Sequence, residues 1–260
     1  MSPKYYDYAV LGASFLGFGA ALSMENVVVI ERGGLFGTEF VNSYKVCEPK
    51  VVEPKTALGK DFLKNLSKRG LVSENGEFYP APAVYVISSY LKEKPFDILL
   101  MTEVTGIQKK DGYFGITVYH SGGFETIYAK NILDTTNLGV GHDKAKKHVI
   151  EKQLNTIMYN PDGVELEGLS YNSQNGLYTY TLPVEPEVSR YDAVEKLCSM
   201  ESIFIEKNLK ISSIASDFSY TVEPCREEIE PQFSWIPSTA FANLVEAFEM
   251  GVQFAEEVKA

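Results

Sequence analysis

The chain has 260 residues and a formal net charge of −11, with 45% hydrophobic and 23% charged residues. This length can hold one large domain, or two small ones packed together, around a sizeable core. The acidic balance disfavours nucleic acid and anionic membrane surfaces as partners, so neither is expected.

The first residues and the cysteines bear on the cellular compartment. The chain enters its first predicted strand almost at once, which predicts that no signal peptide is present. No apolar run reaches the ~18 residues of a membrane helix. Cys47, Cys198 and Cys225 are far apart and form no C-x-x-C pair, which argues against a disulfide framework, a zinc site or a redox disulfide. We expect a soluble cytoplasmic protein.

The first thirty residues follow the order strand, glycine turn, helix, strand and acid. Apolar runs at 7–11 and 27–30 predict two buried strands, and Glu31 follows the second directly. This order is typical of a dinucleotide-binding βαβ unit. The predicted cofactor-binding turn consists of Gly12, Ala13, Ser14, Phe15, Leu16 and Gly17.

Each landmark of this unit has a chemical reason. Gly12 permits a tight turn, and Gly17 lets the helix lie close to the sheet. The helix N-terminus offers unpaired N–H groups and partial positive charge to a pyrophosphate. Glu31 can accept hydrogen bonds from the ribose hydroxyls and would repel a 2′-phosphate. The unit therefore favours FAD or NAD over NADP.

Ser14 departs from the G-x-G-x-x-G pattern, because it stands at the second glycine. Its hydroxyl can itself donate to a phosphate oxygen, which makes the substitution tolerable. The alternative interpretation is an ordinary βαβ crossover without a ligand. The next loop, which includes Arg32, Gly37 and Thr38, either lines the cofactor or is a plain connector. Its place beyond the second strand favours the cofactor.

The elements that follow are predicted from the spacing of their apolar residues. Helices are expected at 56–69 and 82–94, and a short buried strand at 97–101. Strict alternation and Gly-containing turns then predict a three-stranded β-meander at 102–109, 113–120 and 124–128. A separate buried strand is predicted at 131–136.

The order of these parts resembles FAD-dependent oxidoreductases of the glutathione-reductase-like superfamily. The resemblance is carried by TEVTG at 102–106, AKNILDTTNLG at 129–139 and WIPSTAFANLVEAFEMG at 235–251. It is similar to the small, generic members of that superfamily. The resemblance implies a Rossmann-like FAD-binding domain with a parallel sheet and a β-meander.

The same resemblance implies roles for individual residues. The backbone of Val104 would pair with adenine, and Thr135 and Thr136 would lie at the cofactor. Ala242 and Asn243, at the start of the closing helix, would meet the flavin end. Two departures stand out: Thr136 replaces a usual glycine, and the usual G-D before the closing helix is missing.

The resemblance divides the chain into an FAD-binding domain, 1–139 with 232–260, and a substrate or cap domain, 140–231. The inserted segment is predicted to form a small antiparallel sheet with one helix at 188–200. Its strands are expected at 151–160, 176–184, 201–211 and 216–224. The expected class is therefore α/β with an inserted, mainly antiparallel domain.

Candidates for catalysis are few. His142 follows the strand that approaches the cofactor and could act as an acid or base, although a lone loop histidine is more often solvated. Trp235 is the best aromatic candidate for a flavin neighbour. Arg190 and Arg226 could bind a carboxylate or form ordinary salt bridges. The sequence shows no pattern of metal ligands.

The first hypothesis is an FAD-binding oxidoreductase that oxidises a small organic substrate by hydride transfer to the flavin. The second is a non-catalytic or regulatory flavoprotein-like subunit. The third is an NAD-binding dehydrogenase. A homodimer or a complex with a partner subunit is compatible with all three.

Overall fold

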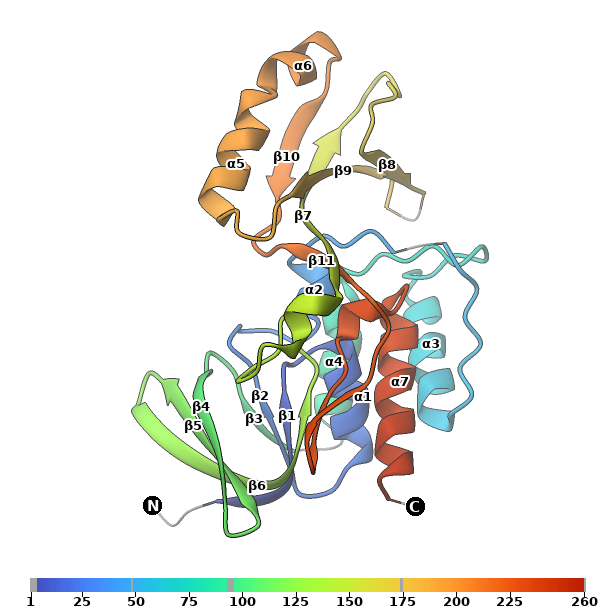
Figure 1. Cartoon of the computed structure of the whole chain (residues 1–260). Helices are drawn as coiled ribbons and strands as arrows, with labels where there is room; N and C mark the ends of the chain where they lie inside the picture. Colours follow the sequence, from blue (N-terminus) through green and yellow to red (C-terminus); the bar gives the residue numbers. More distant parts are fainter. Residues whose placement is uncertain (1–3, 48, 93–95, 174, 260) are drawn as a thin grey trace.

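A computed structural model describes residues 4–47, 49–92, 96–173 and 175–259. It contains an eight-stranded mixed sheet with helices on one face and a separate five-stranded antiparallel sheet. We call the eight-stranded sheet with its helices the larger unit. Figure 1 shows the antiparallel sheet at one end of this unit, and the two helices of the antiparallel sheet lie on one side of it. The α/β class and the second antiparallel sheet that the sequence predicts are both confirmed.

The centre of the larger sheet is parallel, in the order β13-β6-β1-β2-β3, with β12 antiparallel to β13 at one edge. This order places the carboxyl ends of β1, β2 and β6 side by side. The strands are β1 (Tyr5–Leu11), β2 (Val27–Ile30), β3 (Asp97–Leu99), β6 (Gly123–Asp134), β12 (Glu227–Glu230) and β13 (Phe233–Trp235).

The β-meander consists of β4 (Glu103–Lys110), β5 (Tyr113–His120) and the first half of β6. The prediction of two separate strands at 124–128 and 131–136 is wrong, because β6 runs through both. Its first half pairs with β5 and its second half with β1, so the strand passes from the meander into the parallel sheet. The intervening Ala129 and Lys130 continue the alternation of buried and exposed residues, and no turn residue interrupts it.

The two faces of the parallel sheet are covered differently (Figure 1). One face packs against the meander through apolar side chains such as Phe114, Ile116 and Val118. The other face is covered by helices, and a short helix α2 lies where the two sheets approach each other. The helices are α1 (Phe15–Ser23), α2 (Thr38–Val41), α3 (Ala57–Lys68), α4 (Ala83–Leu91) and α7 (Leu244–Glu257). Residues 93–95 of the second predicted helix lie outside the described residues.

Helices α1 and α7 pack backbone against backbone. A Cβ atom on Gly19 would overlap the carbonyl oxygen of Phe248, and one on Gly251 would overlap the carbonyl oxygen of Leu16. Small residues at both crossing points therefore allow the close approach. This contact fixes the N-terminus of α1 relative to the segment that precedes α7.

The second sheet has the order β10-β7-β9-β8, with β11 also paired to β7. The apolar faces of helices α5 and α6 cover it through Leu197 and Phe204, which pack against Leu154 and Tyr180. Its elements are β7 (Val149–Tyr159), β8 (Leu169–Asn172), β9 (Leu177–Val184), α5 (Arg190–Ser199), α6 (Glu201–Glu206), β10 (Lys210–Ile214) and β11 (Ser219–Val222).

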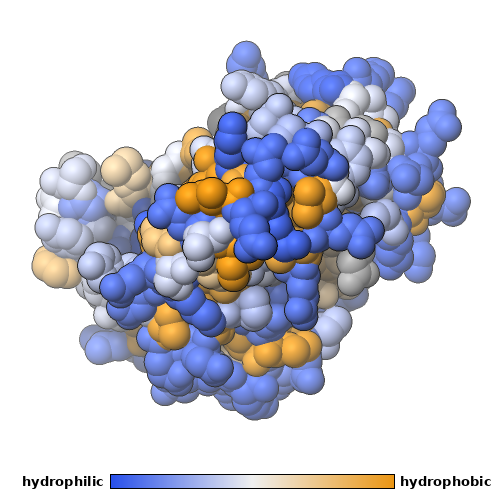
Figure 2. Space-filling view, turned by 90° about the horizontal axis from the view of Figure 1, so that it is seen from above, coloured by the Kyte–Doolittle hydropathy of each residue, from blue (hydrophilic) through white to orange (hydrophobic). Residues whose placement is uncertain are grey.

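The strand predicted at 201–211 is wrong over its first six residues. Glu201–Glu206 form α6, which continues from α5 through Met200 and buries Phe204 against the sheet. Ile203 and Ile205 flank it on the exposed side. Seen from above, this end of the molecule shows hydrophobic residues interspersed among hydrophilic ones (Figure 2). The alternating pattern is typical of a strand, but the packing of Phe204 against the sheet favours a helix.

The segment after α2 ties the two sheets together. The side-chain amide of Asn155 in β7 donates to the carbonyl oxygens of Ser43 and Tyr44, at 2.9 and 3.2 Å. The ammonium group of Lys45 donates to the carbonyl of Tyr220 in β11 at 2.8 Å. Among the described residues, none of the helices combines the length and the apolar character needed to cross a bilayer.

Candidate functional site

The glycine turn lies between β1 and α1, at the carboxyl ends of the parallel strands. Gly12 has a φ of +92°, in the region that favours glycine, and its N–H donates to the carbonyl of Ile30 at 2.9 Å. A Cβ on Gly17 would overlap the Gly12 carbonyl oxygen. The tight turn and the close approach that the sequence predicts are therefore both present.

Ser14 has a different role from the one that the sequence suggested. Its hydroxyl oxygen accepts the N–H of Gly17 at 2.9 Å, as an N-cap does, and its hydrogen goes to the Thr135 hydroxyl at 2.7 Å. Ser14 is buried in this arrangement. The expectation that its hydroxyl donates to a phosphate is therefore corrected: the side chain caps α1 and ties the turn to β6.

Glu31 lies at the carboxyl end of β2, as predicted. One carboxylate oxygen accepts the N–H of Ala13 at 2.8 Å, and the other accepts the N–H of Gly33 at 2.6 Å. Glu31 is partly exposed, and the neighbouring Arg32 is exposed. Glu31 therefore holds the glycine turn and the following loop together while its carboxylate still faces the outside.

The loop after β2 packs directly on the glycine turn. Gly37 has a φ of +71°, and its N–H donates to the carbonyl of Ala13 at 2.7 Å. A Cβ on Gly37 would lie 2.6 Å from the ring of Phe15. Thr38 begins α2. The loop thus lies against the first turn of α1, and it brings an acidic residue to that place.

That residue is Glu39, which the sequence prediction did not include. Its Oε1 accepts the N–H of Phe15 at 2.7 Å and the hydroxyl of Ser238 at 2.8 Å. The Ser238 hydroxyl oxygen also accepts the N–H of Leu16 at 3.4 Å. The other carboxylate oxygen, Oε2, is buried and finds no hydrogen-bond partner among the described residues. An acid two residues after Gly37, in a loop expected to line the cofactor, was the signal available in the sequence.

Burial raises the pKa of Glu39 to about 7, because desolvation outweighs the hydrogen bonds from Phe15 and Ser238. The nearby carboxylate of Glu31 raises it further. Two acidic side chains thus meet at the N-terminus of α1. The partial positive charge of the helix end makes this a favourable place for an anion.

The end of β6 lies beside the turn. The Thr135 hydroxyl lies 3.0 Å from the carbonyl oxygens of Leu11 and Gly12. The N–H and hydroxyl of Thr136 both donate to Asp134, at 2.9 and 2.7 Å. Thr135 is therefore joined to the glycine turn by hydrogen bonds. Val104 lies in β4, with its side chain packed on the meander side of the sheet, and its predicted backbone contact with adenine stays a prediction.

His142 and Trp235 are both buried and do not reach the pocket described below. The His142 side chain is 6% exposed, and its Nε2 lies 3.4 Å from the Asp134 carboxylate. Trp235 is fully buried, and its indole N–H donates to the carbonyl of Thr136 at 2.8 Å. The alternative of a solvated loop histidine is therefore wrong, and neither residue is placed as a catalytic group or flavin neighbour. Their environment is that of a packed core.

The two arginines are also accounted for. Arg226 forms an ion pair with Glu257 at 2.6 Å. Arg190 donates to the carbonyl of Ala215 through two nitrogens, at 3.2 and 2.9 Å. Both therefore have structural partners, as the salt-bridge alternative expects for Arg226.

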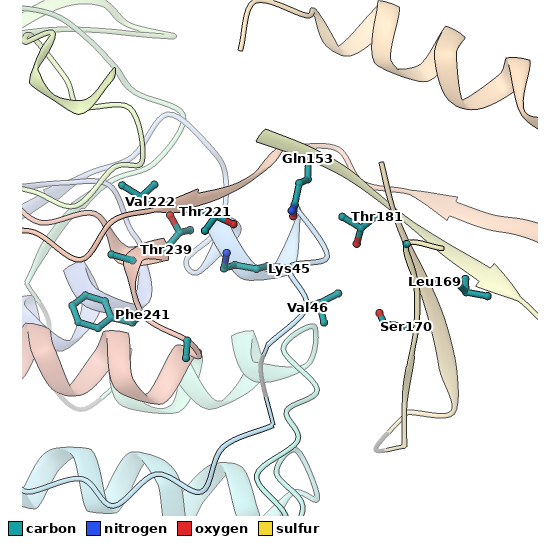
Figure 3. A pocket seen from close by; sticks show the side chains of 13 residues that line it. Lys45, Val46, Gln153, Leu169, Ser170, Thr181, Thr221, Val222, Thr239 and Phe241 are labelled. Atoms are coloured by element: carbon teal, nitrogen blue, oxygen red, sulfur yellow. The ribbon is translucent and has the colours of Figure 1, made fainter. Parts of the chain in front are cut away.

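A pocket of about 600 Å³ lies between the second sheet and the segment that precedes α7 (Figure 3). It is lined by polar side chains, including Lys45, Gln153 and Thr221, and by apolar ones such as Phe241. Ala242, a predicted cofactor contact, lines it too. Asn243 does not: it is buried, and its side chain caps α7 by accepting the N–H groups of Val245 and Glu246.

The sequence matches no protein-family model and no protein of curated function. Solved structures do match its fold. p-Nitrophenol 4-monooxygenase from Pseudomonas putida DLL-E4 is 13% identical with a TM-score of 0.60, covering 99% of this chain and 82% of that one. Glycine oxidase from Geobacillus kaustophilus is 14% identical with a TM-score of 0.59, covering 98% and 95%.

A third match is aklavinone-11 hydroxylase, solved in a ternary complex with FAD and aklavinone. It is 10% identical with a TM-score of 0.58, and the match covers 99% of this chain and 63% of that one. At these identities the similarity shows the fold alone. The chain therefore has the fold of these flavoenzymes across nearly its whole length, in both the larger unit and the second sheet.

Proposed function

We propose that the protein is an FAD-dependent oxidoreductase that acts on a small organic substrate. The observation that carries the proposal is the glycine turn with Glu31 beside it. Gly12 and Gly17 form the close turn between β1 and α1, and Glu31 ends β2. This arrangement, in a fold shared with a hydroxylase solved with FAD, is the one that binds dinucleotides at the carboxyl ends of parallel strands.

The residues present fit the adenosine ribose of FAD, but the N–H groups that would bind its pyrophosphate already have acceptors in the protein. Each oxygen of Glu31 accepts one backbone N–H and keeps lone-pair capacity for a ribose hydroxyl. The pyrophosphate would belong on the first turn of α1, at the N–H groups of Phe15 and Leu16. Those groups already donate to Glu39 and Ser238. Binding therefore requires the Glu39 carboxyl to give way.

The pocket beside the α7 segment is our candidate for the flavin and substrate end. When bound, FAD supplies a ring that accepts a hydride from the substrate. In the pocket, Lys45 and the hydroxyls of Thr221 and Thr181 provide polar contacts, and Phe241 and Leu169 provide apolar ones. This mixture suits a small substrate with both a polar group and a hydrocarbon part. We propose residues 1–139 with 232–260 as the FAD-binding part and 140–231 as the substrate-binding part.

The finer assignment to the glutathione-reductase-like superfamily is part of the proposal, and the domain boundaries need one refinement. Strand β12, within the segment 140–231, pairs with β13 in the larger sheet. The substrate-binding part is therefore best taken as the second sheet with α5 and α6.

A non-catalytic, flavoprotein-like subunit is the second candidate, and Glu39 is the observation that favours it. An acid on the N-terminus of α1 opposes the binding of a pyrophosphate. Lys45 is the one titratable side chain among the described residues that line the pocket. An NAD-binding dehydrogenase, the third hypothesis, fits the glycine turn and Glu31 equally well.

The absorption spectrum of the purified protein after incubation with FAD and removal of free FAD tests the proposal. An oxidoreductase retains a flavin spectrum that bleaches with one of a set of amines, amino acids or hydroxy acids. A flavin spectrum that none of these substrates bleaches supports the non-catalytic subunit. A colourless protein that binds NAD instead supports the dehydrogenase.

A further inference from the structure

We infer that the Glu39 carboxyl is a resident ligand of the FAD site: it occupies the position of the pyrophosphate and must leave before the cofactor binds. The inference rests on the proposed function, because it concerns the same site. It makes Glu39 the residue that sets the affinity for FAD.

The geometry of Glu39 is that of a ligand on a helix end. Its Oε1 accepts the N–H of Phe15 in the first turn of α1, at 2.7 Å. The same oxygen accepts the Ser238 hydroxyl from the segment before α7, at 2.8 Å. These donors come from two elements far apart in sequence, and they converge where a dinucleotide phosphate would lie.

A second carboxylate in the same protein shows what an optimised structural cap looks like. Glu249 of α7 reaches the N-terminus of α3, where it accepts the N–H groups of Lys55 and Thr56 and the Thr56 hydroxyl at 2.6–2.9 Å. Both of its oxygens are satisfied. Glu39, by contrast, leaves Oε2 buried without a partner in the part of the chain that the structure describes. An unsatisfied buried oxygen is costly, so the contacts of Glu39 are those of a stand-in rather than of a permanent cap.

The surroundings of Glu39 oppose its charge. Of the described titratable groups, Glu31 and the Cys47 thiol face it. Phosphate charges arriving at the α1 N-terminus would add to this repulsion. Glu39 lies on α2, a helix of four residues, so a small shift of this helix is enough to withdraw the carboxyl. The segment that follows α2 contacts β7 and β11, so the shift would reach the pocket.

The test compares the affinity for FAD of the wild-type protein and of three variants, all as full chains. Glu39→Gln keeps the size of the side chain and removes its charge, and Glu39→Ala removes the group. Glu256→Gln, at an exposed position of α7, makes the same change in net charge away from the site. We expect both Glu39 variants to bind FAD at least about tenfold more tightly than the wild type and the control. Equal affinities in all four proteins overturn the inference and leave the proposed function standing.

A second probe covers the case in which none of the proteins binds FAD. Inorganic pyrophosphate should raise the melting temperature of Glu39→Ala but not of the wild type, because only the variant has a vacant helix end. This result, together with no FAD binding, supports Glu39 as the occupant of an anion site at the α1 N-terminus, while the assignment of that site to FAD and the proposed function both fail. If pyrophosphate stabilises neither protein and FAD binds to neither, both are wrong.

Discussion

The carboxylate of Glu39 and the backbone N–H of Phe15 form a 2.7 Å hydrogen bond at the N-terminus of α1. This bond joins the loop after β2 to the helix that a dinucleotide-binding fold normally turns toward phosphate. The bond holds the carboxyl in a buried place, where desolvation raises its pKa despite the opposing effect of the bond itself. It also links the stability of the protein to its affinity for a cofactor.

Stability should fall as pH rises through the range in which Glu39 ionises. The carboxyl has an ordinary pKa of 4.5 and a pKa of about 7 in the folded protein. Between these values the folded chain holds a proton that the unfolded chain has lost, so unfolding becomes easier as pH increases. The full effect is on the order of 3 kcal/mol. Melting temperatures at about pH 5 and about pH 8 measure it.

Glu39→Gln is the matching variant for this prediction, because an amide cannot ionise. Its melting temperature should decline less than that of the wild type over the same pH range, and it should be the more stable protein at the alkaline end. A wild type and a variant with parallel pH profiles would show that the Glu39 carboxyl is not titrating in this range.

Glu249 predicts the opposite pH dependence. Burial alone would raise its pKa, but hydrogen bonds from Thr56, Lys55 and Gln253 outweigh it and hold the pKa below the usual value. The stability that it contributes is therefore present above the unfolded pKa and is lost as pH falls through the folded one. Glu249→Gln should cost about 1–3 kcal/mol near neutral pH, because the Thr56 hydroxyl loses its acceptor. Urea unfolding checks this; an unchanged midpoint contradicts the capping role.

Glu31→Ala should weaken FAD binding by at least about tenfold, because a ribose hydroxyl loses its charged acceptor. The variant should also lose about 1–3 kcal/mol of stability, since the N–H groups of Ala13 and Gly33 lose theirs. Glu25→Ala, an exposed acid just before β2, is the control and should change neither quantity. Dialysis with FAD and thermal unfolding measure the two effects. Unchanged FAD affinity would reject the ribose assignment.

Gly19→Ala should destabilise the protein by at least about 2 kcal/mol, because its Cβ would overlap the backbone of Phe248. Gly106→Ala is the matched control. A Cβ there meets nothing within 4 Å, and the effect should be small. Denaturant unfolding of both variants tests whether α1 and α7 pack backbone to backbone. Two equally stable variants would refute that contact.

The βαβ unit and the meander could be predicted because their signals are local. The glycine turn, the apolar runs on either side and the acid at Glu31 lie within about thirty residues, and their periodicity is strong. β6 shows the limit of such reasoning. The strand pairs with β5 in its first half and with β1 in its second, and no turn residue separates the halves, so its continuity at Ala129 depends on partners elsewhere in the chain.

The site itself was predicted only in part, for a similar reason. Gly12, Gly17 and Glu31 have roles that follow from the conformation of their own segment. The role of Glu39 does not follow from its own segment, because the tertiary fold brings its partners Phe15 and Ser238 to it. Ser14 was misinterpreted because its hydroxyl is satisfied inside the core, by Gly17 and Thr135. The indole N–H of Trp235 is likewise satisfied inside the core, by the carbonyl of Thr136. A sequence pattern cannot tell an inward hydrogen bond from an outward one.

A crystal structure of Glu39→Ala grown with FAD would show directly whether the N-terminus of α1 is the pyrophosphate site. We expect a phosphate oxygen within about 3 Å of the Phe15 N–H and the adenosine ribose on Glu31. FAD bound elsewhere, or absent while the first turn of α1 faces water, would contradict this assignment.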